Sequence, residues 1–388
     1  MTKGMIDEIV EAYAAAAVRC EAAGLHGVEV HCAHGYLVQQ FLSPNANRRT
    51  DEYGGSFENR ARFLMDVMRA VRAATGPNFA VGARLSPDGA SGGVHLDDNQ
   101  NVIPLLEEEG LVDFINVSQG SYYAFPKMIG GMHEPVGYEM DLSEQITRIA
   151  TVPTMVTGRV RTLEEADQIV RTGGADLCGM TRAHIADPDI VIKTQEGREE
   201  EIRPCIACNQ GCVGNLLGPA GRMGCVVNPG VGFELSVGDD HIGTAEVAKK
   251  VLIIGGGPAG MEAARVAALR GHQVTLAEAT TELGGMVNFA AKLPKRHGIA
   301  DLTVWLEAEI YRLGVDVRLS TYLEAGDVAA FGADHVIVAT GSSPRMDGVQ
   351  VTNPGLPAQH MKQSHVLSSV DLLTHGRNQN LQNRRGGG

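Results

Sequence analysis

Short apolar runs alternate along this chain with longer stretches in which apolar and polar positions repeat with a helical period. Residues 1–195 contain five such runs, at 27–31, 79–86, 112–118, 152–158 and 175–180. Short apolar strands joined by amphipathic helices are typical of parallel βα units. We therefore expect functional side chains to gather after the carboxyl ends of these strands.

The pattern changes after residue 195, and four further segments follow. Residues 196–235 are rich in glycine and cysteine with little periodicity, and 236–249 form a polar linker. A second α/β unit, with a strand–glycine turn–helix pattern, occupies 250–345. The polar, glycine-rich tail, 346–388, is expected to be irregular and disordered at its end.

Four cysteines in the glycine-rich segment follow the spacing C-x2-C-x3-C-x12-C: Cys205, Cys208, Cys212 and Cys225. Four thiolates at this spacing can enclose a metal centre, and ligation by thiolates alone selects zinc or an iron–sulfur cluster. The spacing leaves these two open. The other three cysteines lie scattered in apolar contexts, which fits buried thiols in a reducing cytoplasm better than disulfides.

The sequence VLIIGGGPAG begins the second α/β unit. Gly255, Gly257 and Gly260 form a G-x-G-x-x-G turn between a strand and a helix, where the backbone can approach a pyrophosphate. Glu278 ends the next strand and can accept hydrogen bonds from ribose hydroxyls. Strand, glycines, helix and acid together predict a dinucleotide site. A soft-metal site beside a nucleotide site suggests electron transfer.

Composition and charge argue against some classes of binding partner. The chain of 388 residues is 44% apolar and carries a net charge of −13, which argues against nucleic acids and anionic membrane surfaces as partners. No apolar run approaches the length of a spanning helix, and residues 1–20 predict an acidic amphipathic helix rather than a signal peptide. We expect a cytoplasmic protein with a small-molecule substrate.

Two histidines and a tyrosine follow the first predicted strand. His31, His34 and Tyr36 could donate hydrogen bonds to a carbonyl or to developing negative charge. On these residues alone, a histidine pair that caps a loop is the simpler interpretation. A two-histidine metal site is a third, although no carboxylate completes it at a convincing spacing.

The motif H-x-A-H-G-Y-L-x-x-F-L-S-P, followed by N-x-R-x-D-x-Y-G-G-S-x-E-N-R-x-R-F, resembles the Old Yellow Enzyme family of FMN-dependent oxidoreductases. The cysteine cluster and the dinucleotide unit resemble its multi-domain branch, the 2,4-dienoyl-CoA reductase and trimethylamine dehydrogenase type. The resemblance implies a partial (β/α)8 TIM barrel (the last five strands), an iron–sulfur segment and a Rossmann-like domain.

The resemblance also implies roles for residues. His31 and His34 bind the activating group of the substrate, and Tyr36 donates a proton. Arg84 lies against the flavin ring, and the flavin phosphate is held by Gly158, Arg159, Gly179, Met180 and Arg182. Tyr122, Tyr123 and His133 are expected to shape the substrate pocket. Gly341, in ATG, resembles a flavin-contacting strand end.

The resemblance implies FMN, a [4Fe–4S] cluster, FAD (or an ADP-like nucleotide) and NAD(P)H as cofactors. Electrons would pass from NAD(P)H through FAD and the cluster to FMN, and reduce an activated C=C bond. The alternative is an amine dehydrogenase or N-demethylase that passes electrons to an external acceptor. A remnant that binds metal and nucleotide without catalysis is a third hypothesis, and a homo-oligomer is possible in each.

A barrel of this family has eight strands, and this chain offers five, which match the last five. Five parallel strands cannot close a barrel. The second α/β unit also ends before the returning part of a full dinucleotide domain. We therefore interpret the chain as a truncated product and predict that it binds FMN poorly by itself.

Overall fold

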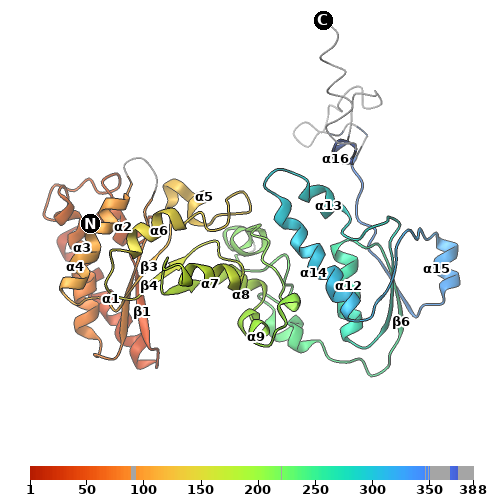
Figure 1. Ribbon diagram of the computed structural model, residues 1–388. Helices are drawn as coiled ribbons and strands as arrows, with labels where there is room; N and C mark the ends of the chain where they lie inside the picture. Colours follow the sequence, from red (N-terminus) through yellow and green to blue (C-terminus); the bar gives the residue numbers. More distant parts are fainter. Residues whose placement is uncertain (89–92, 220, 346, 348, 350–367, 375–388) are drawn as a thin grey trace, which may run out of the picture. The chain divides into compact units, whose positions relative to one another are not determined.

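The computed structural model describes residues 1–388 except 89–92, 220, 346, 348, 350–367 and 375–388. The described chain divides into two compact units, Met1–Val191 and Ile192–Gly388 (Figure 1). Most of the predicted irregular tail lies outside the described residues. The finer division into five segments stays a prediction.

The first unit is built on one parallel sheet, and all five predicted strands are present. The strands follow the order β1 (Gly27–His31), β2 (Ala80–Leu85), β3 (Phe114–Val117), β4 (Thr154–Thr157) and β5 (Leu177–Gly179). The helices are α1 (Lys3–Ala22), α2 (Leu37–Leu42), α3 (Phe57–Ala74), α4 (Leu96–Glu108), η1 (Tyr122–Ala124), α5 (Phe125–Met128), α6 (Met140–Thr147), α7 (Leu163–Arg171), α8 (Thr181–Ala186) and, across the division, α9 (Ile190–Gln195).

The strand register brings the predicted site residues to one edge of this sheet. His31 pairs with Arg84 at the carboxyl ends of β1 and β2, and Thr157 pairs with Gly179 at the ends of β4 and β5. Parallel strands place all their carboxyl ends on the same side. Within the described residues, β1 and β5 each pair with one neighbour only, so the sheet is the expected partial barrel.

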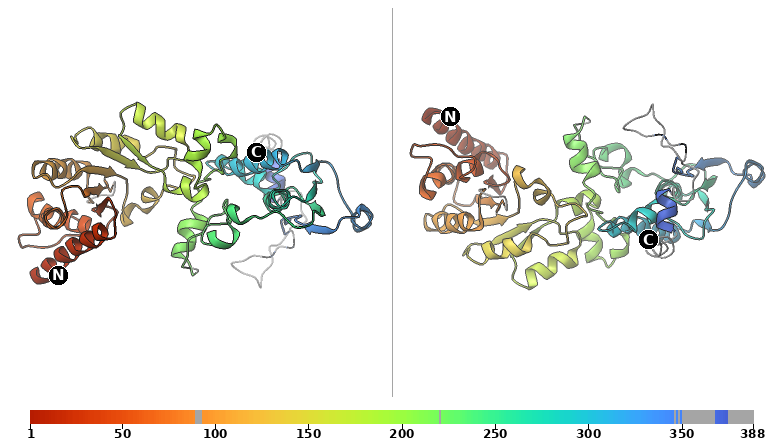
Figure 2. Two further views of the ribbon diagram at one scale, coloured as in Figure 1. Left: turned by 90° about the horizontal axis from the view of Figure 1, so that it is seen from below. Right: turned by 90° about the horizontal axis from the view of Figure 1, so that it is seen from above.

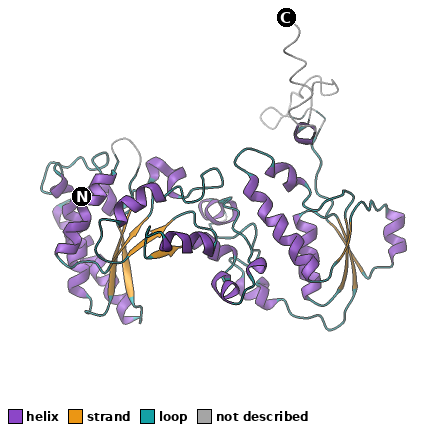
Figure 3. Cartoon of the chain, in the orientation of Figure 1, coloured by secondary structure: helices purple, strands orange, loops and turns teal. Residues whose placement is uncertain are grey.

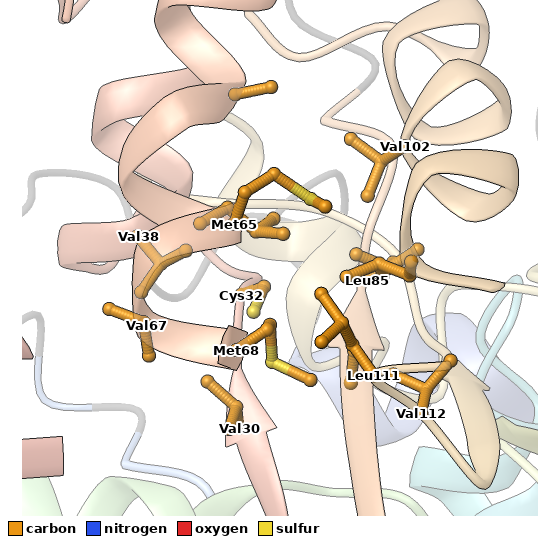
Figure 4. Close-up of a cluster of buried hydrophobic side chains, with 14 of the residues drawn as sticks. Val30, Cys32, Val38, Met65, Val67, Met68, Leu85, Val102, Leu111 and Val112 are labelled. Carbon is orange, nitrogen blue, oxygen red and sulfur yellow. The ribbon is translucent and has the colours of Figure 1, made fainter. Parts of the chain in front are cut away.

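Helix α3 supplies much of the core beneath that edge. Ser56 caps its first turn by accepting a hydrogen bond from the backbone N–H of Asn59. Its buried face carries Phe63, which stacks on Phe41 with ring centroids 4.3 Å apart. Figure 4 shows Met65 and Met68 of the same helix against residues from the strands and from α4. Helix α1 packs beside α3, as the red and orange helices in Figures 1 and 2 show.

The second unit contains a separate parallel sheet (Figure 3). Its strand order is β8 (Asp316–Arg318), β7 (Gln273–Ala277), β6 (Lys250–Ile254) and β9 (His335–Val338). The helices of this α/β region are α12 (Pro258–Leu269), α13 (Met286–Ala291), η5 (His297–Ala300), α14 (Asp301–Arg312) and α15 (Ala325–Phe331), and α16 (Ser369–Thr374) follows later. Helices α12 and α14 pack together, and their apolar residues form the core with β6 and β7. The predicted Rossmann-like pattern is confirmed.

The cysteine-rich segment of the second unit contains only short elements. They are η2 (Glu199–Glu201), the π-helical turn η3 (Gln210–Gly214), α10 (Asn215–Leu217), α11 (Glu234–Val237) and η4 (Asp239–His241). Little regular structure therefore holds this segment, as its sequence predicts. Across the described part of the chain, no helix combines the length and apolar character that crossing a membrane requires.

Candidate functional site

The histidines and tyrosines predicted from the sequence come together at the carboxyl ends of β1, β2 and β3. The His31 ring lies 5.1 Å from that of His34 and 5.0 Å from that of Tyr36, between ring centroids. Tyr122, from η1, brings its ring to 5.5 Å from Tyr36 and donates a hydrogen bond of 2.9 Å to its hydroxyl. We call His31, His34, Tyr36 and Tyr122 the histidine–tyrosine group.

His34 is held in an unusual backbone conformation. Its φ of 60° lies in the left-handed region, which non-glycine residues rarely adopt and which often marks functional sites. The buried Ser86 hydroxyl accepts a hydrogen bond of 3.0 Å from the backbone N–H of His34. On the side chain, Nε2 lies 2.6 Å from the hydroxyl of Ser118, which also accepts a bond from Nε of Arg84.

Both imidazoles of the group are neutral near pH 7. Burial, followed by the charge of Arg84, lowers the pKa of His31. Burial, Arg84 and His31 together lower the pKa of His34 to about 3. A neutral imidazole still donates one N–H, so the pair can bind a carbonyl oxygen without adding charge.

Tyr36 keeps its proton over a wide pH range. The hydrogen bond that Tyr36 shares with Tyr122, and then burial, raise the pKa of Tyr36, so its hydroxyl stays protonated. Both side chains are about half exposed, so this face of the unit is open.

The other two pocket candidates do not join the histidine–tyrosine group. Tyr123 has an exposed side chain, and its backbone N–H donates to the hydroxyl of Ser121. His133 is exposed in the loop between α5 and α6, where it makes no hydrogen bond or ring contact with the described residues. Sequence reasoning missed Ser86 and Ser118, although each is the last residue of a predicted strand.

The predicted phosphate loops lie at the ends of β4 and β5. Gly158 and Arg159 follow β4; Gly179 ends β5, and Met180 and Arg182 follow it. Arg182 donates a hydrogen bond of 2.7 Å to the carbonyl of Gly130. Burial, and then the charges of Arg161 and Arg182, lower the pKa of Arg159, so these guanidinium groups lie near one another.

One feature of these loops suits an anion. The side chain of Arg159 is buried, and its Nε has no hydrogen-bond partner among the described residues. The carboxylate of Glu139 accepts a hydrogen bond of 2.7 Å from the backbone N–H of Arg159. A Cβ on Gly158 would lie 2.3 Å from Cδ of that carboxylate, so glycine is needed there. The donors fit the phosphate of FMN.

The four cysteines have side chains of intermediate exposure and lie in one short stretch of the second unit. Burial raises the pKa of Cys208, and the nearby Cys212 and Cys225 raise it further. Gly224 donates a backbone hydrogen bond to Gly211, and a Cβ on Gly211 would lie 2.8 Å from Cα of Cys225. The last cysteine is thereby held against the turn that carries the third.

The backbone around Cys208 is strained. Ala207 and Asn209 both adopt positive φ, 52° and 58°, which turns the chain sharply on each side of the thiol. In the described residues no set of three or more His, Cys, Asp or Glu side chains is already spaced to hold a metal ion. The donor chemistry, four thiols in an irregular, tightly turned segment, nevertheless fits a thiolate-ligated centre.

The glycine turn of the second unit has the geometry expected for a dinucleotide. Gly255 adopts φ 107°, and a Cβ there would lie 2.3 Å from the carbonyl oxygen of Ala339. A Cβ on Gly260 would lie 1.9 Å from the oxygen of Gly255. Gly257 caps α12, and Gly341 adopts φ 72° after β9. Only glycine permits this close approach of the loop, the helix and β9.

Glu278 is fixed by the loop that it was predicted to serve. It accepts hydrogen bonds from the backbone N–H groups of Gly256, at 2.6 Å, and Thr280, at 2.8 Å. Although burial opposes ionisation, these bonds lower the pKa of Glu278, which stays charged. A fixed carboxylate at the end of β7 can accept from a ribose hydroxyl.

Known proteins match both units of the chain. The sequence profile of the NADH:flavin oxidoreductase / NADH oxidase family matches residues 1–201, and that of the pyridine nucleotide-disulphide oxidoreductases matches residues 229–367. An NADH oxidase of Thermoanaerobacter brockii is 41% identical over 374 residues, which cover 96% of this chain and 56% of that protein.

Two further relatives carry different activities in their names. An N,N-dimethylglycine/sarcosine dehydrogenase of Chromohalobacter salexigens is 36% identical, over 94% of this chain and 53% of its own length. The structure of a 2-naphthoyl-CoA reductase–2-naphthoyl-CoA complex matches with a TM-score of 0.86 at 33% identity, over 97% of this chain and 55% of that one. The chain spans about half the length of the curated relatives it matches.

Proposed function

We propose a function for this chain from one premise: it belongs to the NADH:flavin oxidoreductase / NADH oxidase family. The function is that of an FMN- and [4Fe–4S]-dependent oxidoreductase, which passes electrons from NAD(P)H through FAD and the cluster to FMN. Its substrate is an activated C=C bond, conjugated to a carbonyl or thioester. The catalytic residues are His31, His34 and Tyr36.

The residues that would hold each group are spread over both units. Arg84 and the loops at Gly158–Arg159 and Gly179–Arg182 would hold FMN, the four cysteines the cluster, and the Gly255–Gly260 turn with Glu278 and Gly341 the FAD. When bound, these groups supply hydride transfer at the substrate and single-electron transfer between the flavins. Their binding here rests on the donors described above.

The observation that carries the proposal is the state of the histidine–tyrosine group. Two neutral imidazoles can donate hydrogen bonds to the oxygen of a conjugated carbonyl, which draws electron density from the C=C bond. Tyr36, protonated and hydrogen-bonded to Tyr122, can then give a proton to the carbon that becomes negative. Polarisation and protonation are what the protein must add to hydride transfer.

The local charge also favours a carbonyl over an amine. Arg84 lies close enough to lower the pKa of both histidines, and its ion pair with Glu29 is long, at 3.8 Å. A guanidinium near the imidazoles attracts the negative end of a carbonyl or carboxylate and repels an alkylammonium. An uncharged or anionic substrate therefore suits this site.

One observation favours a second candidate, oxidation of a methylated amine. Tyr36, Tyr122 and Phe125 form a partly exposed row of rings, with centroids 5.5 and 6.3 Å apart. Aromatic faces bind alkylated ammonium groups.

A competition between the two half-reactions tests the proposal. The chain would be purified without oxygen, supplied with FAD, iron and sulfide, and saturated with FMN at a concentration set by its measured affinity. Cinnamate and a 2-enoyl thioester would be offered with NADH, and sarcosine in a separate experiment without NADH. We expect saturated product from the alkenes at a rate above that of free FMN.

The Tyr36→Phe variant serves as the chemical control, with Tyr123→Phe as its match on the same face. Tyr36→Phe should bind the alkenes and lose 10²- to 10⁴-fold in turnover, the usual contribution of one acid catalyst, whereas Tyr123→Phe should change little. Bleaching of FMN by sarcosine, with no alkene reduced above the free-flavin rate, would favour the second candidate and refute the first.

A further inference from the structure

The four cysteines lie between two residues that form an ion pair. Arg203 precedes Cys205 by two positions, and Asp239, in η4, follows Cys225. Nη2 of Arg203 lies 3.1 Å from Oδ2 of Asp239. This one contact joins the chain on either side of residues 204–238, the stretch that carries all four cysteines and that we call the cysteine segment.

The ion pair is seated on the helices of the nucleotide-binding sheet. Arg265, from α12, donates to the other oxygen of Asp239 at 3.0 Å. Trp305, from α14, contacts both arginines. Its ring centroid is 4.8 Å from the guanidinium carbon of Arg203 and 5.5 Å from that of Arg265. We call Arg203, Asp239, Arg265 and Trp305 the clasp.

The clasp holds charged side chains in a buried position, which costs free energy. The side chains of Arg203 and Arg265 are only 5% and 3% exposed, and a buried guanidinium is costly unless it is paired. Asp239 is shared by both arginines, and Glu262 also pairs with Arg265, at 2.9 Å. Removing Asp239 therefore takes away the carboxylate that the two buried cations share.

Trp305 contributes to the clasp through the face of its ring rather than through its N–H group. Its side chain is buried, and Nε1 has no hydrogen-bond partner in the described part of the chain. Indole is the aromatic group that binds cations most strongly. A buried indole whose N–H stays unbonded, but whose ring contacts two guanidinium groups, is best explained by cation–π contacts.

We propose that the clasp is a positioning device for the cysteine segment: it closes the segment at its base and fixes it to the nucleotide-binding domain. The segment between its ends has only short helical turns, and buried side chains such as Ile206 and Val227 anchor it beside the clasp. Joining its ends removes much of the chain entropy that metal ligation would otherwise have to overcome. The inference rests on the proposed function only for the identity of the metal centre.

The clasp and metal binding by the cysteines must affect each other equally, because the two equilibria are linked. If the clasp favours metal binding by the cysteines, metal binding must stabilise the clasp to the same extent. Trp305 is the single tryptophan of the sequence, so its fluorescence reports on the clasp without labelling. Loading the cysteines should therefore change the emission of Trp305.

The test measures metal binding in the full chain with Co²⁺, whose thiolate complexes absorb visible light, and with a reconstituted iron–sulfur cluster. Asp239→Asn removes the shared charge and keeps the shape of the side chain. Asp316→Asn is its match, because Asp316 pairs with Arg318 in the same unit and is equally exposed, at 52% against 50%. Asp239→Glu is the conservative rescue.

We expect Asp239→Asn to bind Co²⁺ about tenfold more weakly than the wild type and to release iron to a chelator correspondingly faster. Asp316→Asn should match the wild type, and Asp239→Glu should recover most of the affinity. If Asp239→Asn does not fold, Arg203→Lys keeps the charge, loses the planar contact with the indole, and should show a smaller loss in the same direction.

The outcomes separate the clasp from the proposed function. Equal Co²⁺ affinity and iron release in Asp239→Asn and Asp316→Asn overturn the clasp, even if a cluster forms. Failure to form any iron–sulfur cluster, together with weaker Co²⁺ binding by Asp239→Asn, supports the clasp and counts against the proposed function. Unchanged Trp305 emission on Co²⁺ binding contradicts the reciprocal coupling.

Discussion

The neutral state of His34 makes the stability of the first unit depend on pH. In the unfolded chain this imidazole has an ordinary pKa of 6.5, whereas in the folded chain burial, Arg84 and His31 lower it to about 3. The unfolded state therefore binds the proton more readily. The stabilisation is fully present above pH 6.5 and is lost as the pH falls from 6.5 towards about 3.

The size of the effect follows from the gap between the two pKa values. At pH 5 the unfolded histidine is protonated and the folded one is not, about 1.5 pH units below the unfolded pKa. At about 1.36 kcal/mol per unit, the loss relative to pH 7.5 is about 2 kcal/mol. His31, whose pKa is also lowered, adds to the loss in the same direction.

The assay compares the wild type with His34→Asn in urea unfolding at pH 7.5 and pH 5. Asparagine does not titrate and tolerates the left-handed backbone that His34 adopts, at φ 60°. Between the two pH values, the free energy of unfolding of the variant should therefore fall by about 2 kcal/mol less than that of the wild type. Equal losses in the two proteins, within about 0.5 kcal/mol, would show that His34 is not held neutral by the fold.

Three further substitutions test other parts of the structure. Tyr122→Phe removes the hydrogen bond that raises the pKa of Tyr36, so the ultraviolet titration of that tyrosine should move to lower pH. Phe63→Ala deletes a fully buried ring, and urea unfolding should show a loss of about 3–5 kcal/mol. Gly255→Ala places a Cβ 2.3 Å from the oxygen of Ala339 at a φ of 107°, so titration calorimetry should find ADP binding abolished.

Each of these has a matched control. Tyr123→Phe should leave the titration of Tyr36 unchanged, since Tyr123 is exposed and lies outside the histidine–tyrosine group. Val170→Ala, on the exposed face of α7, should change the free energy of unfolding by less than about 0.5 kcal/mol. Gly326→Ala, in α15 with open space around it, should bind ADP as the wild type does. A control that behaves like its partner contradicts the corresponding explanation.

The fold could be predicted because its signals are local. Each of the five strands in the first unit is a short apolar run, and the glycine turn before α12 carries its own pattern. Strand boundaries were predicted up to two residues too wide, as at 112–118 against Phe114–Val117, because apolar residues continue into the adjoining loops. The sheet order follows from the parallel βα connections.

The site could be predicted only in part, since its chemistry depends on contacts between distant segments. His31 ends β1, and His34 and Tyr36 follow it closely, so the sequence itself brings the three together. Tyr122, 86 residues beyond Tyr36, was placed among three pocket candidates by resemblance alone, and only the structure separates it from Tyr123 and His133. No local pattern marks Glu139 as the acid that meets the backbone N–H of Arg159.

Protonation states are the hardest feature to predict from the sequence, and the proposed reaction depends on them. A histidine pair in a loop has an ordinary pKa until the fold buries it beside Arg84, which comes from a different strand. The same packing brings Tyr122 onto Tyr36, and this raises the pKa of that phenol. Neutral donors for a carbonyl and a protonated phenol thus have one cause, the convergence of three strand ends. A change that opens this edge should alter both states together.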